Sequence, residues 1–373
     1  MTPEQRQQAV VDVFAEIGGD LVDPPIMMPA SIPLELSGEA VRARLCVTVD
    51  GEGREIALRP DLTLAVAREE VARRRARDVG ERASRYAARA FRLPAEPGDP
   101  LEFTQVGFER FGAAMGAAAD AEVFSRVAAA ARAGGASTAE AWFGDLAVFP
   151  AFVDALDMSD GAAGALKRAF RQAGGVKALL RAEEGAARHG LAGRLDGASW
   201  DEAEAVVRDV MAISGIQPVG ARGLDEIVER LLAQAADAGA GRIPAEARRS
   251  LDAVLDVEVE IAAAADALSA IAAEAALTGL DDVLQALQTR MDAAAAEAGA
   301  WLGPARFGTP FGRRFNYYDG FVFELFAPKA PWTKPFGSGG RYDQLLSDLS
   351  EGDVSATAVG GIVRPDRIEG GAR

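Results

Sequence analysis

The chain has 373 residues, of which 49% are hydrophobic, and its 56 acidic against 40 basic residues give a formal net charge of −16. This composition predicts a globular protein of one large or two ordinary domains, and the negative charge disfavours nucleic-acid binding, because polyanions are repelled unless basic residues gather on one face. The sequence contains no run of about 18 apolar residues and no signal-peptide pattern, so neither a membrane span nor secretion is predicted, and a cytoplasmic location is expected.

The N-terminal part of the chain predicts helices that alternate with antiparallel strands. Thr2 and Gln5 form a helix-start pattern, and the helix is expected to stop at Gly18. Two alternating runs separated by a turn predict a β-hairpin over Arg44–Val49 and Glu55–Leu58. The further elements expected are a helix over Leu62–Arg75, strands over Ala88–Arg92 and Leu101–Phe111, a helix over Ala118–Ala133 and a strand over Glu140–Gly144.

The pattern becomes helical in the middle of the chain and returns to strand signals near its end. Residues 147–300 carry apolar side chains at helical spacing, interrupted by glycines and prolines. After this block we expect a strand over Tyr317–Phe326, a loop over Ala327–Gly340, a helix over Arg341–Leu349 and a strand over Ala356–Val363. Residues 1–146 and 301–373 are therefore predicted to form one α+β domain, with residues 147–300 as a helical insertion.

The scarcity of cysteine and histidine excludes several kinds of site. Cys46 is the single cysteine and His189 the single histidine, so an internal disulfide and a cysteine/histidine zinc site are excluded. Chemistry based on a serine, histidine and aspartate would depend on that one histidine, and it is disfavoured. No catalytic residue, metal or cofactor is predicted.

Four short polar and aromatic runs stand out as candidate binding residues. They are Arg59–Thr63, Phe103–Glu109, Phe315–Gly320 and Gly337–Asp343. Each run alone has an ordinary structural explanation: an aspartate before a helix is often its N-cap, paired tyrosines often cover a core, and clustered glycines often form a turn. Gln105 and Glu109 would share one face of a strand, as residues of a solvated face also do. The occurrence of all four runs in one chain, in this order, indicates a binding site.

These runs and their flanking segments resemble motifs of histidyl-tRNA synthetases. Ile56–Thr63 resembles the segment that leads into the first amino-acid contacts, and Ala90–Glu109 resembles class II motif 2. Tyr317-Tyr318 and Gly339–Asp343 resemble the two histidine signatures, and Ala358–Ile368 resembles motif 3. The resemblance covers roughly residues 1–145 and 305–368. It implies the class II aminoacyl-tRNA synthetase-like fold, an antiparallel sheet flanked by helices, here with a helical insertion.

The resemblance also implies roles for individual residues. Asp61 with Thr63 would hold an α-ammonium group, Glu109 would accept a hydrogen bond from an imidazole N–H, the tyrosines would wall the ring, and the glycines would let backbone approach the ligand. The residues that carry over as histidine contacts are Asp61, Thr63, Gln105, Glu109, Arg313, Tyr317, Tyr318, Gly339 and Gly340. Arg92 and Arg367 fall at arginines that hold ATP phosphates in the synthetases, which implies a residual phosphate site.

Several departures argue against a working synthetase. Glu96 and Asp99 stand where a triphosphate would need cations, and Arg364 replaces an expected glycine. The sequence ends at Arg373, where a synthetase would continue with an anticodon-binding domain of about a hundred residues. With these departures, and with its Gly144–Phe149 run, the chain resembles the regulatory subunits of ATP phosphoribosyltransferase more than the synthetases.

The resemblance therefore implies a regulatory protein with no chemistry of its own. We expect it to bind free L-histidine and to activate or feedback-regulate a short-form ATP phosphoribosyltransferase in the first step of histidine biosynthesis. A hetero-oligomer with that catalytic subunit is expected, as is a homodimer through the synthetase-like domain with Val22–Met28 near the interface. Two alternatives stay open: an enzyme that forms an aminoacyl-adenylate for an acceptor other than tRNA, and a scaffold whose pocket is vestigial.

Overall fold

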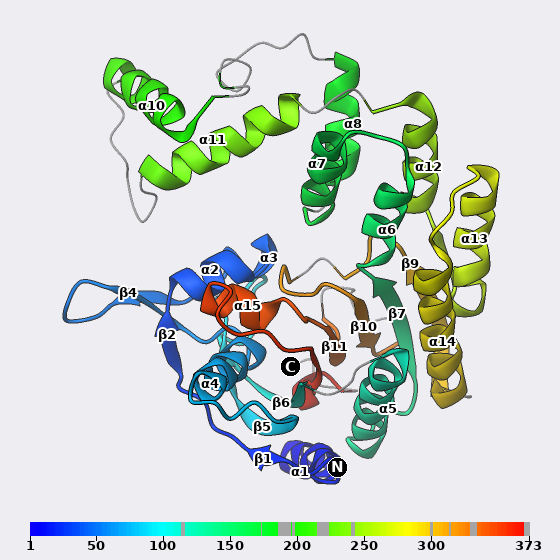
Figure 1. The fold of residues 1–373 in the computed structure, drawn as a ribbon. Helices are drawn as coiled ribbons and strands as arrows, with labels where there is room; N and C mark the ends of the chain where they lie inside the picture. The colour runs from blue at the N-terminus through cyan, green and yellow to red at the C-terminus, as the bar shows by residue number, and fades with distance from the viewer. Residues whose placement is uncertain are drawn as a thin grey trace. The chain divides into compact units, whose positions relative to one another are not determined.

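The computed structural model describes residues 1–112, 116–172, 174–185, 195, 198–214, 224–239, 243–298, 301–312, 315–328 and 334–368. The chain forms two compact units (Figure 1). The first unit consists of Met1–Val148, Val254–Ala273 and Gly279–Arg373, and the second of Phe149–Ala253 and Glu274–Thr278. None of the helices in these described parts combines the length and apolar character needed to cross a membrane.

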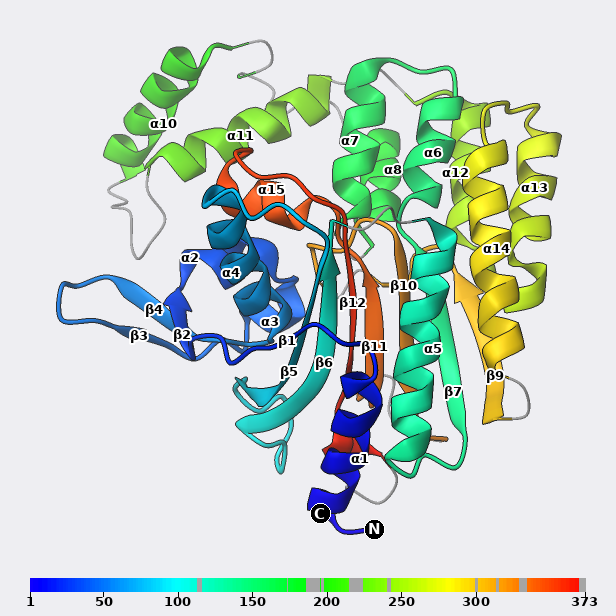
Figure 2. The same ribbon diagram turned by 60° about the horizontal axis from the view of Figure 1, so that its bottom comes forward.

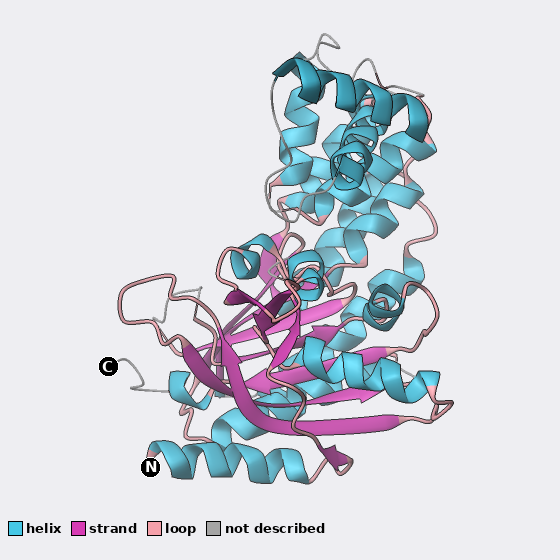
Figure 3. Cartoon of the chain, turned by 90° about the vertical axis from the view of Figure 1, so that its left-hand side faces the viewer, coloured by secondary structure: helices cyan, strands magenta, loops and turns pink. Residues whose placement is uncertain are grey.

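The first unit is built on a nine-stranded sheet (Figure 3). In spatial order its strands are β1 (Asp20–Leu21), β5 (Arg82–Phe91), β6 (Glu102–Phe111), β12 (Ala358–Val363), β11 (Gly337–Arg341), β10 (Phe321–Phe326), β7 (Ala139–Asp145), β9 (Leu302–Gly308) and β8 (Glu258–Glu260). The pairs β1–β5 and β7–β9 are parallel, and the other pairs are antiparallel. A separate three-stranded sheet consists of β2 (Met27–Pro29), β4 (Glu55–Leu58) and β3 (Val47–Val49). This architecture confirms the predicted α+β class.

Helices cover both faces of the large sheet. The helices of the first unit are α1 (Pro3–Ala15), α2 (Ser31–Leu36), α3 (Glu39–Arg42), α4 (Thr63–Arg75), α5 (Ala117–Ala133), α13 (Ala264–Glu274), α14 (Asp281–Ala298) and α15 (Leu345–Ser350), with 3-10 turns at Ile261–Ala263 and Pro365–Arg367. Figure 2 shows α1, α5 and α14 in front of the strands. Aromatic side chains pack α1 and α5 against the sheet. The Phe14 and Phe108 ring centroids lie 5.2 Å apart, and the Phe124 ring centroid lies 5.2 Å from those of both Phe143 and Phe323.

The opposite face of the sheet carries α4 and α15 and a second apolar cluster. This cluster includes Leu62, Leu64, Val66, Tyr86, Phe111, Tyr342, Leu345 and Leu346, all at most 1% exposed. Side chains alternate along a strand, so Phe108 of β6 points to α1 while its neighbour Glu109 points to α4. The sheet therefore separates the aromatic contacts under α1 and α5 from the layer that holds the candidate site.

The N-terminal elements largely follow the sequence-based predictions. Thr2 Oγ1 accepts from the Gln5 N–H at 3.2 Å and Gln5 Oε1 accepts from the Thr2 N–H at 2.9 Å, so the predicted helix start is confirmed. The predicted hairpin is confirmed as β3 and β4, which pair antiparallel. Strand β5 begins at Arg82, earlier than the predicted Ala88, because residues 82–87 pair with the second half of β6.

Two predictions near the C-terminus differ from the structure. Tyr317 and Tyr318 precede β10 instead of lying within it. The run Gly337–Arg341 is a strand in the middle of the sheet, where a loop was predicted. Glycine is rare in strands, but a Cβ on Gly339 would come within 2.6 Å of the Gly360 carbonyl oxygen and 2.7 Å of the Phe323 ring. The glycines are needed for close strand packing.

The second unit is helical. Its helices are α6 (Val148–Ala155), α7 (Asp160–Phe170), α8 (Gly175–Gly185), α10 (Trp200–Ser214), α11 (Leu224–Gly239) and α12 (Ala245–Leu255). Phe149 stacks on Phe170 with ring centroids 4.3 Å apart, and Val207 and Val228 belong to a buried cluster between α10 and α11. His189 lies outside the described residues.

The division between the units differs from the predicted insertion over residues 147–300. Strand β8 pairs with β9 of the large sheet, and α14 is tied to α5 by an ion pair between Arg290 and Asp120 at 2.7 Å. These segments therefore belong to the first unit. Helical periodicity alone does not tell whether a helix packs on its helical neighbours or on a sheet, and this limited the sequence-based boundary.

Candidate functional site

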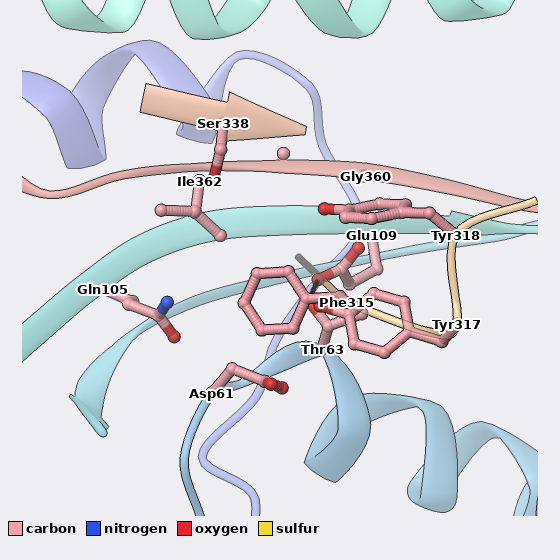
Figure 4. A pocket seen from close by; sticks show the side chains of 11 residues that line it. Asp61, Thr63, Gln105, Glu109, Phe315, Tyr317, Tyr318, Ser338, Gly360 and Ile362 are labelled. Carbon is pink, nitrogen blue, oxygen red and sulfur yellow. Dashed lines mark hydrogen bonds between the residues drawn. The ribbon is translucent and has the colours of Figure 1, made fainter. Parts of the chain in front are cut away.

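A polar pocket lies on the α4 face of the large sheet (Figure 4). Its empty volume is about 310 Å³, a figure that includes space open to solvent. Its lining residues are Asp61, Thr63, Gln105, Glu109, Phe315, Tyr317, Tyr318, Ser338, Gly360, Gly361 and Ile362. They come from the start of α4, from β6, β11 and β12, and from the segment before β10.

Glu109 is the most enclosed polar group of the pocket. Its side chain is 1% exposed, and its carboxyl accepts three hydroxyl hydrogen bonds. Thr63 Oγ1 and Tyr86 OH both donate to Oε1 at 2.7 Å, and Tyr342 OH donates to Oε2. Burial raises the pKa of Glu109 to about 7, with a contribution from the nearby Asp61, although the three hydroxyls lower it. Glu109 thus titrates near neutral pH.

The backbone of β12 makes room for this carboxyl. Gly360 is the residue paired with Glu109 across the β12–β6 ladder. A Cβ at position 360 would lie 1.6 Å from Glu109 Oε2, which no real structure tolerates. Glycine at this position is therefore a steric requirement of the buried glutamate.

Asp61 combines a helix cap with an unsatisfied oxygen. Its side chain is 2% exposed, and Oδ1 accepts from the Leu64 N–H at 3.0 Å, which caps the start of α4. Within the described part of the chain, Oδ2 is buried and accepts no hydrogen bond. Burial raises the pKa of Asp61, and the positive charge of Arg92 counteracts this effect. A buried carboxylate oxygen without a donor is costly, so the site favours a ligand that supplies one.

Gln105 supports the same helix start. Its Oε1 accepts from the Leu62 N–H at 3.0 Å, so Gln105 and Asp61 together hold the first turn of α4. Figure 4 shows both side chains on the edge of the pocket that lies opposite the tyrosines. Gln105 is 6% exposed, and it lies on the same face of β6 as Glu109, as strand alternation requires.

Aromatic rings form another wall of the pocket. The Phe315 and Tyr317 rings stack with centroids 5.1 Å apart, and the Tyr317 and Tyr318 rings lie 4.9 Å apart. Tyr342 contacts both tyrosines edge-on, at 5.9 and 6.2 Å. Such a wall suits a flat, partly polar group, because ring faces and edges carry opposite partial charges.

The structure brings most of the predicted site residues together. Six of them line this one pocket: Asp61, Thr63, Gln105, Glu109, Tyr317 and Tyr318. Gly339 and Gly340 do not line it. Ser338 of the same strand does, and a Cβ on Gly340 would lie 2.9 Å from Tyr318. Arg313 lies outside the described residues.

Sequence reasoning did not identify several residues of the site. Tyr86 and Tyr342 donate to Glu109, Gly360 gives it space, and Phe315 and Ile362 complete the walls. Tyr342 lies within Gly339–Asp343, which resembles a histidine signature, and Phe315 begins the candidate run Phe315–Gly320, so these two runs could have indicated them. Gly360 lies in the Ala358–Ile368 segment that resembles motif 3, but its role beside Glu109, like that of Tyr86, comes from strand pairing with β6.

The arginines predicted for phosphate make contacts within the protein. Arg92 Nε donates to the Pro60 carbonyl oxygen at 2.8 Å, and the guanidinium lies 5.4 Å from the Phe103 ring centroid. Burial lowers the pKa of Arg92 to about 10, so it stays charged at neutral pH. Arg367 Nη1 donates to the Pro335 carbonyl oxygen at 3.1 Å.

The residues predicted to oppose a nucleotide are also engaged within the protein. The Arg364 guanidinium lies 3.6 Å from the Phe103 ring centroid and pairs with Asp366 at 2.6 Å. Lys334 lies 3.2 Å from a carboxylate oxygen of Glu96 and 2.9 Å from one of Asp99. The two Lys334 ion pairs contact the β5–β6 loop.

Comparison with known proteins places these features in a family. The family model for histidyl-tRNA synthetase matches residues 2–197 and 203–368. An ATP phosphoribosyltransferase regulatory subunit from Brucella anthropi is 32% identical over 356 residues, which cover 94% of this chain and 92% of that protein. One from Chelativorans sp. is 31% identical over 346 residues, which cover 91% and 90%.

Solved structures agree on the fold. A structure from Bacillus halodurans, described as an ATP phosphoribosyltransferase regulatory subunit/histidyl-tRNA synthetase, matches with a TM-score of 0.64 and 20% identity, covering 100% of this chain and 79% of that one. Histidyl-tRNA synthetase from Nostoc sp. PCC 7120 matches with a TM-score of 0.57 and 12% identity, covering 98% and 70%. These matches confirm the predicted synthetase-like fold.

Glu109→Gln should make stability less dependent on pH. The pKa of Glu109 is about 7 in the folded protein, above its ordinary value of 4.5, so between these values the folded state binds more protons than the unfolded state. The free energy of unfolding should therefore fall as pH rises through this window, by at most about 3 kcal/mol. Denaturant unfolding across the window should show a smaller fall in the glutamine variant. Parallel profiles for the two proteins would contradict the raised pKa.

Gly360→Ala should displace Glu109. The added methyl group would overlap Oε2, so the variant should lose about 1–3 kcal/mol of stability, measured by chemical denaturation. Gly80→Ala is the matched control, because a Cβ at position 80 meets nothing within 4 Å. If both variants unfold at the wild-type denaturant concentration, the tight approach of β12 to Glu109 is wrong.

Proposed function

This chain belongs to the histidyl-tRNA synthetase-like family and, within it, to the ATP phosphoribosyltransferase regulatory subunits, and on that premise we propose that its pocket binds free L-histidine. The protein is a regulatory subunit in histidine biosynthesis and is not itself the catalyst, as the sequence-based resemblance predicted. Its ligand, its assembly and its cytoplasmic location are proposals.

The unsatisfied Asp61 Oδ2 is the observation that carries the histidine proposal. A ligand ammonium group would give this buried oxygen a charge-assisted donor, and Thr63 and Gln105 line the pocket beside it. An amino acid with a free α-amino group therefore fits this end of the pocket. The aromatic wall and Glu109 then select its side chain.

Glu109 suits an imidazole. A carboxylate has about four acceptor sites, and three hydroxyls occupy three of them, which leaves one for a ligand N–H. The pKa of Glu109, about 7, is close to that of a free imidazole, roughly 6.5, so the pair can share a proton near neutral pH. An aliphatic side chain would leave this acceptor unused, and this difference favours histidine.

The partner follows from the family. The relatives are regulatory subunits of ATP phosphoribosyltransferase, so we propose a hetero-oligomer with the short-form catalytic chain, whose activity histidine modulates through this subunit. We also propose a homodimer through the synthetase-like domain. Ile26 and Met27, 46% and 58% exposed, are apolar side chains in the segment predicted to lie near that interface.

Asp61→Asn should weaken histidine binding about 10- to 150-fold, because a charge-assisted hydrogen bond contributes about 1.5–3 kcal/mol. Asparagine can still accept from the Leu64 N–H, so the helix cap should persist. Isothermal titration calorimetry with L-histidine measures the change. Asp50→Asn is the control, since the Asp50 carboxylate also accepts backbone N–H groups but lies in the β3–β4 turn. Equal affinity in Asp61→Asn and wild type would refute the ammonium contact.

Co-expression with a short ATP phosphoribosyltransferase chain should give a complex that co-purifies. Histidine should change the phosphoribosyltransferase activity of this complex about 5- to 150-fold, the usual range of allosteric coupling. A parallel assay of histidine-dependent ATP–pyrophosphate exchange should give no signal with this subunit. Exchange above background would instead support the adenylate-forming alternative.

A further inference from the structure

A chain of buried ion pairs runs through the first unit beside the pocket layer. Its members are Asp120 on α5, Asp145 at the end of β7, Arg290 on α14 and Arg341 at the end of β11. Arg290 Nε lies 2.7 Å from Asp120 Oδ2, and its Nη1 lies 2.6 Å from Asp145 Oδ2. Arg341 Nη2 lies 2.6 Å from Asp120 Oδ1. Both aspartates are 0% exposed, and the two arginine side chains are 11% and 8% exposed.

One end of this chain reaches the pocket through β11. Arg341 directly precedes Tyr342, whose hydroxyl donates to Glu109. The Arg341 carbonyl oxygen accepts from the Asp319 N–H at 3.1 Å, and Asp319 follows the pocket residue Tyr318. The backbone of Arg341 therefore joins two parts of the pocket, while its side chain joins the ion pairs.

The other end reaches the point where the chain enters the second unit. Asp145 Oδ1 accepts from the Ala147 N–H at 3.1 Å, and the Leu146 N–H donates to the Gly320 carbonyl oxygen at 3.0 Å. Helix α6 begins at Val148, and the second unit begins at Phe149. These residues belong to the Gly144–Phe149 run, which resembles the regulatory subunits.

Arg290 is the cation that bridges the two aspartates. A planar guanidinium can donate to two carboxylates from one fixed geometry, which the ammonium group of lysine does less well. Because both carboxylates are fully buried, a shift of one changes the electrostatic environment of the other through Arg290. The Arg341 side chain and Asp145 are thus connected through Asp120 and Arg290, in addition to the backbone hydrogen bond between Leu146 and Gly320.

We propose that Arg290 is a positioning residue through which histidine occupancy of the pocket is coupled to the start of α6, and so to the helical unit. This inference rests on the proposed histidine site. Ligand contact with the Tyr317–Tyr318 segment would act on Arg341, then on Asp120 and Arg290, and finally on Asp145 and the first turn of α6. The alternative is that these ion pairs only stabilise the fold.

Hydrogen exchange with and without L-histidine distinguishes these explanations. In wild type, histidine should slow exchange at amides around the pocket and also at residues 145–155, by at least about threefold. In Arg290→Lys, pocket amides should remain protected and the histidine dissociation constant should stay within about threefold of wild type, while the response at residues 145–155 is lost. A purely stabilising ion pair would raise exchange in both states equally and keep the response.

Arg132→Lys is the matched control. Arg132 on α5 pairs with Glu297 on α14, so it joins the same two helices through a more exposed ion pair, with side chains 38% and 29% exposed, that does not involve Asp145 or Arg341. This variant should keep the wild-type response at residues 145–155. Asp145→Asn provides a second test if Arg290→Lys does not fold, since Asp120 keeps its cation and the Ala147 N–H keeps an acceptor.

The outcomes separate this inference from the proposed function. A response at residues 145–155 that persists in Arg290→Lys, or in Asp145→Asn, overturns the coupling and leaves the histidine site standing. The coupling is also overturned if histidine protects wild-type pocket amides without affecting residues 145–155. Absence of any histidine effect in wild type overturns both.

Discussion

The buried carboxyl of Glu109 is the group on which the candidate site depends. Three hydroxyls from α4, β5 and the end of β11 converge on it, and the neighbouring strand offers only a glycine across from it. The hydrogen bonds and the close strand contact around this one carboxyl thus constrain how α4, β5, β11 and β12 are placed around β6. The same burial leaves its pKa near 7, so this group is both an anchor of the fold and a candidate contact for a ligand.

Asp61 differs from Glu109 because one of its carboxylate oxygens has no hydrogen-bond donor in the described part of the chain. One of its oxygens caps α4 and the other is left without a donor within the described residues, so the protein retains a buried oxygen with no hydrogen bond at the pocket edge. Natural proteins rarely keep such an atom without a functional reason. Glu109, with one acceptor site left, and Asp61, with one oxygen that has no donor among the described residues, together suit a ligand with one N–H donor and one cationic end.

The structure also shows how a synthetase-like fold can serve a regulatory subunit. Arg364, in motif 3, stacks on Phe103 and pairs with Asp366, and Lys334 engages the acidic β5–β6 loop. These charged side chains thus make ion pairs and a ring contact within the protein. The buried ion pairs around Arg290 extend this use of charge toward the entry of the helical unit.

The sequence by itself determined what depends on near neighbours: the capping box at Thr2, the β3–β4 hairpin, the shared face of Gln105 and Glu109, and the order of motifs that indicated the family. Only the tertiary structure decided that the glycine run is a strand, that α14 belongs with the sheet, and that Asp61 keeps a free oxygen. The reason is sequence separation. The Glu109 partners Thr63 and Tyr342 lie 46 and 233 residues away, and strand pairing at that distance leaves no local pattern.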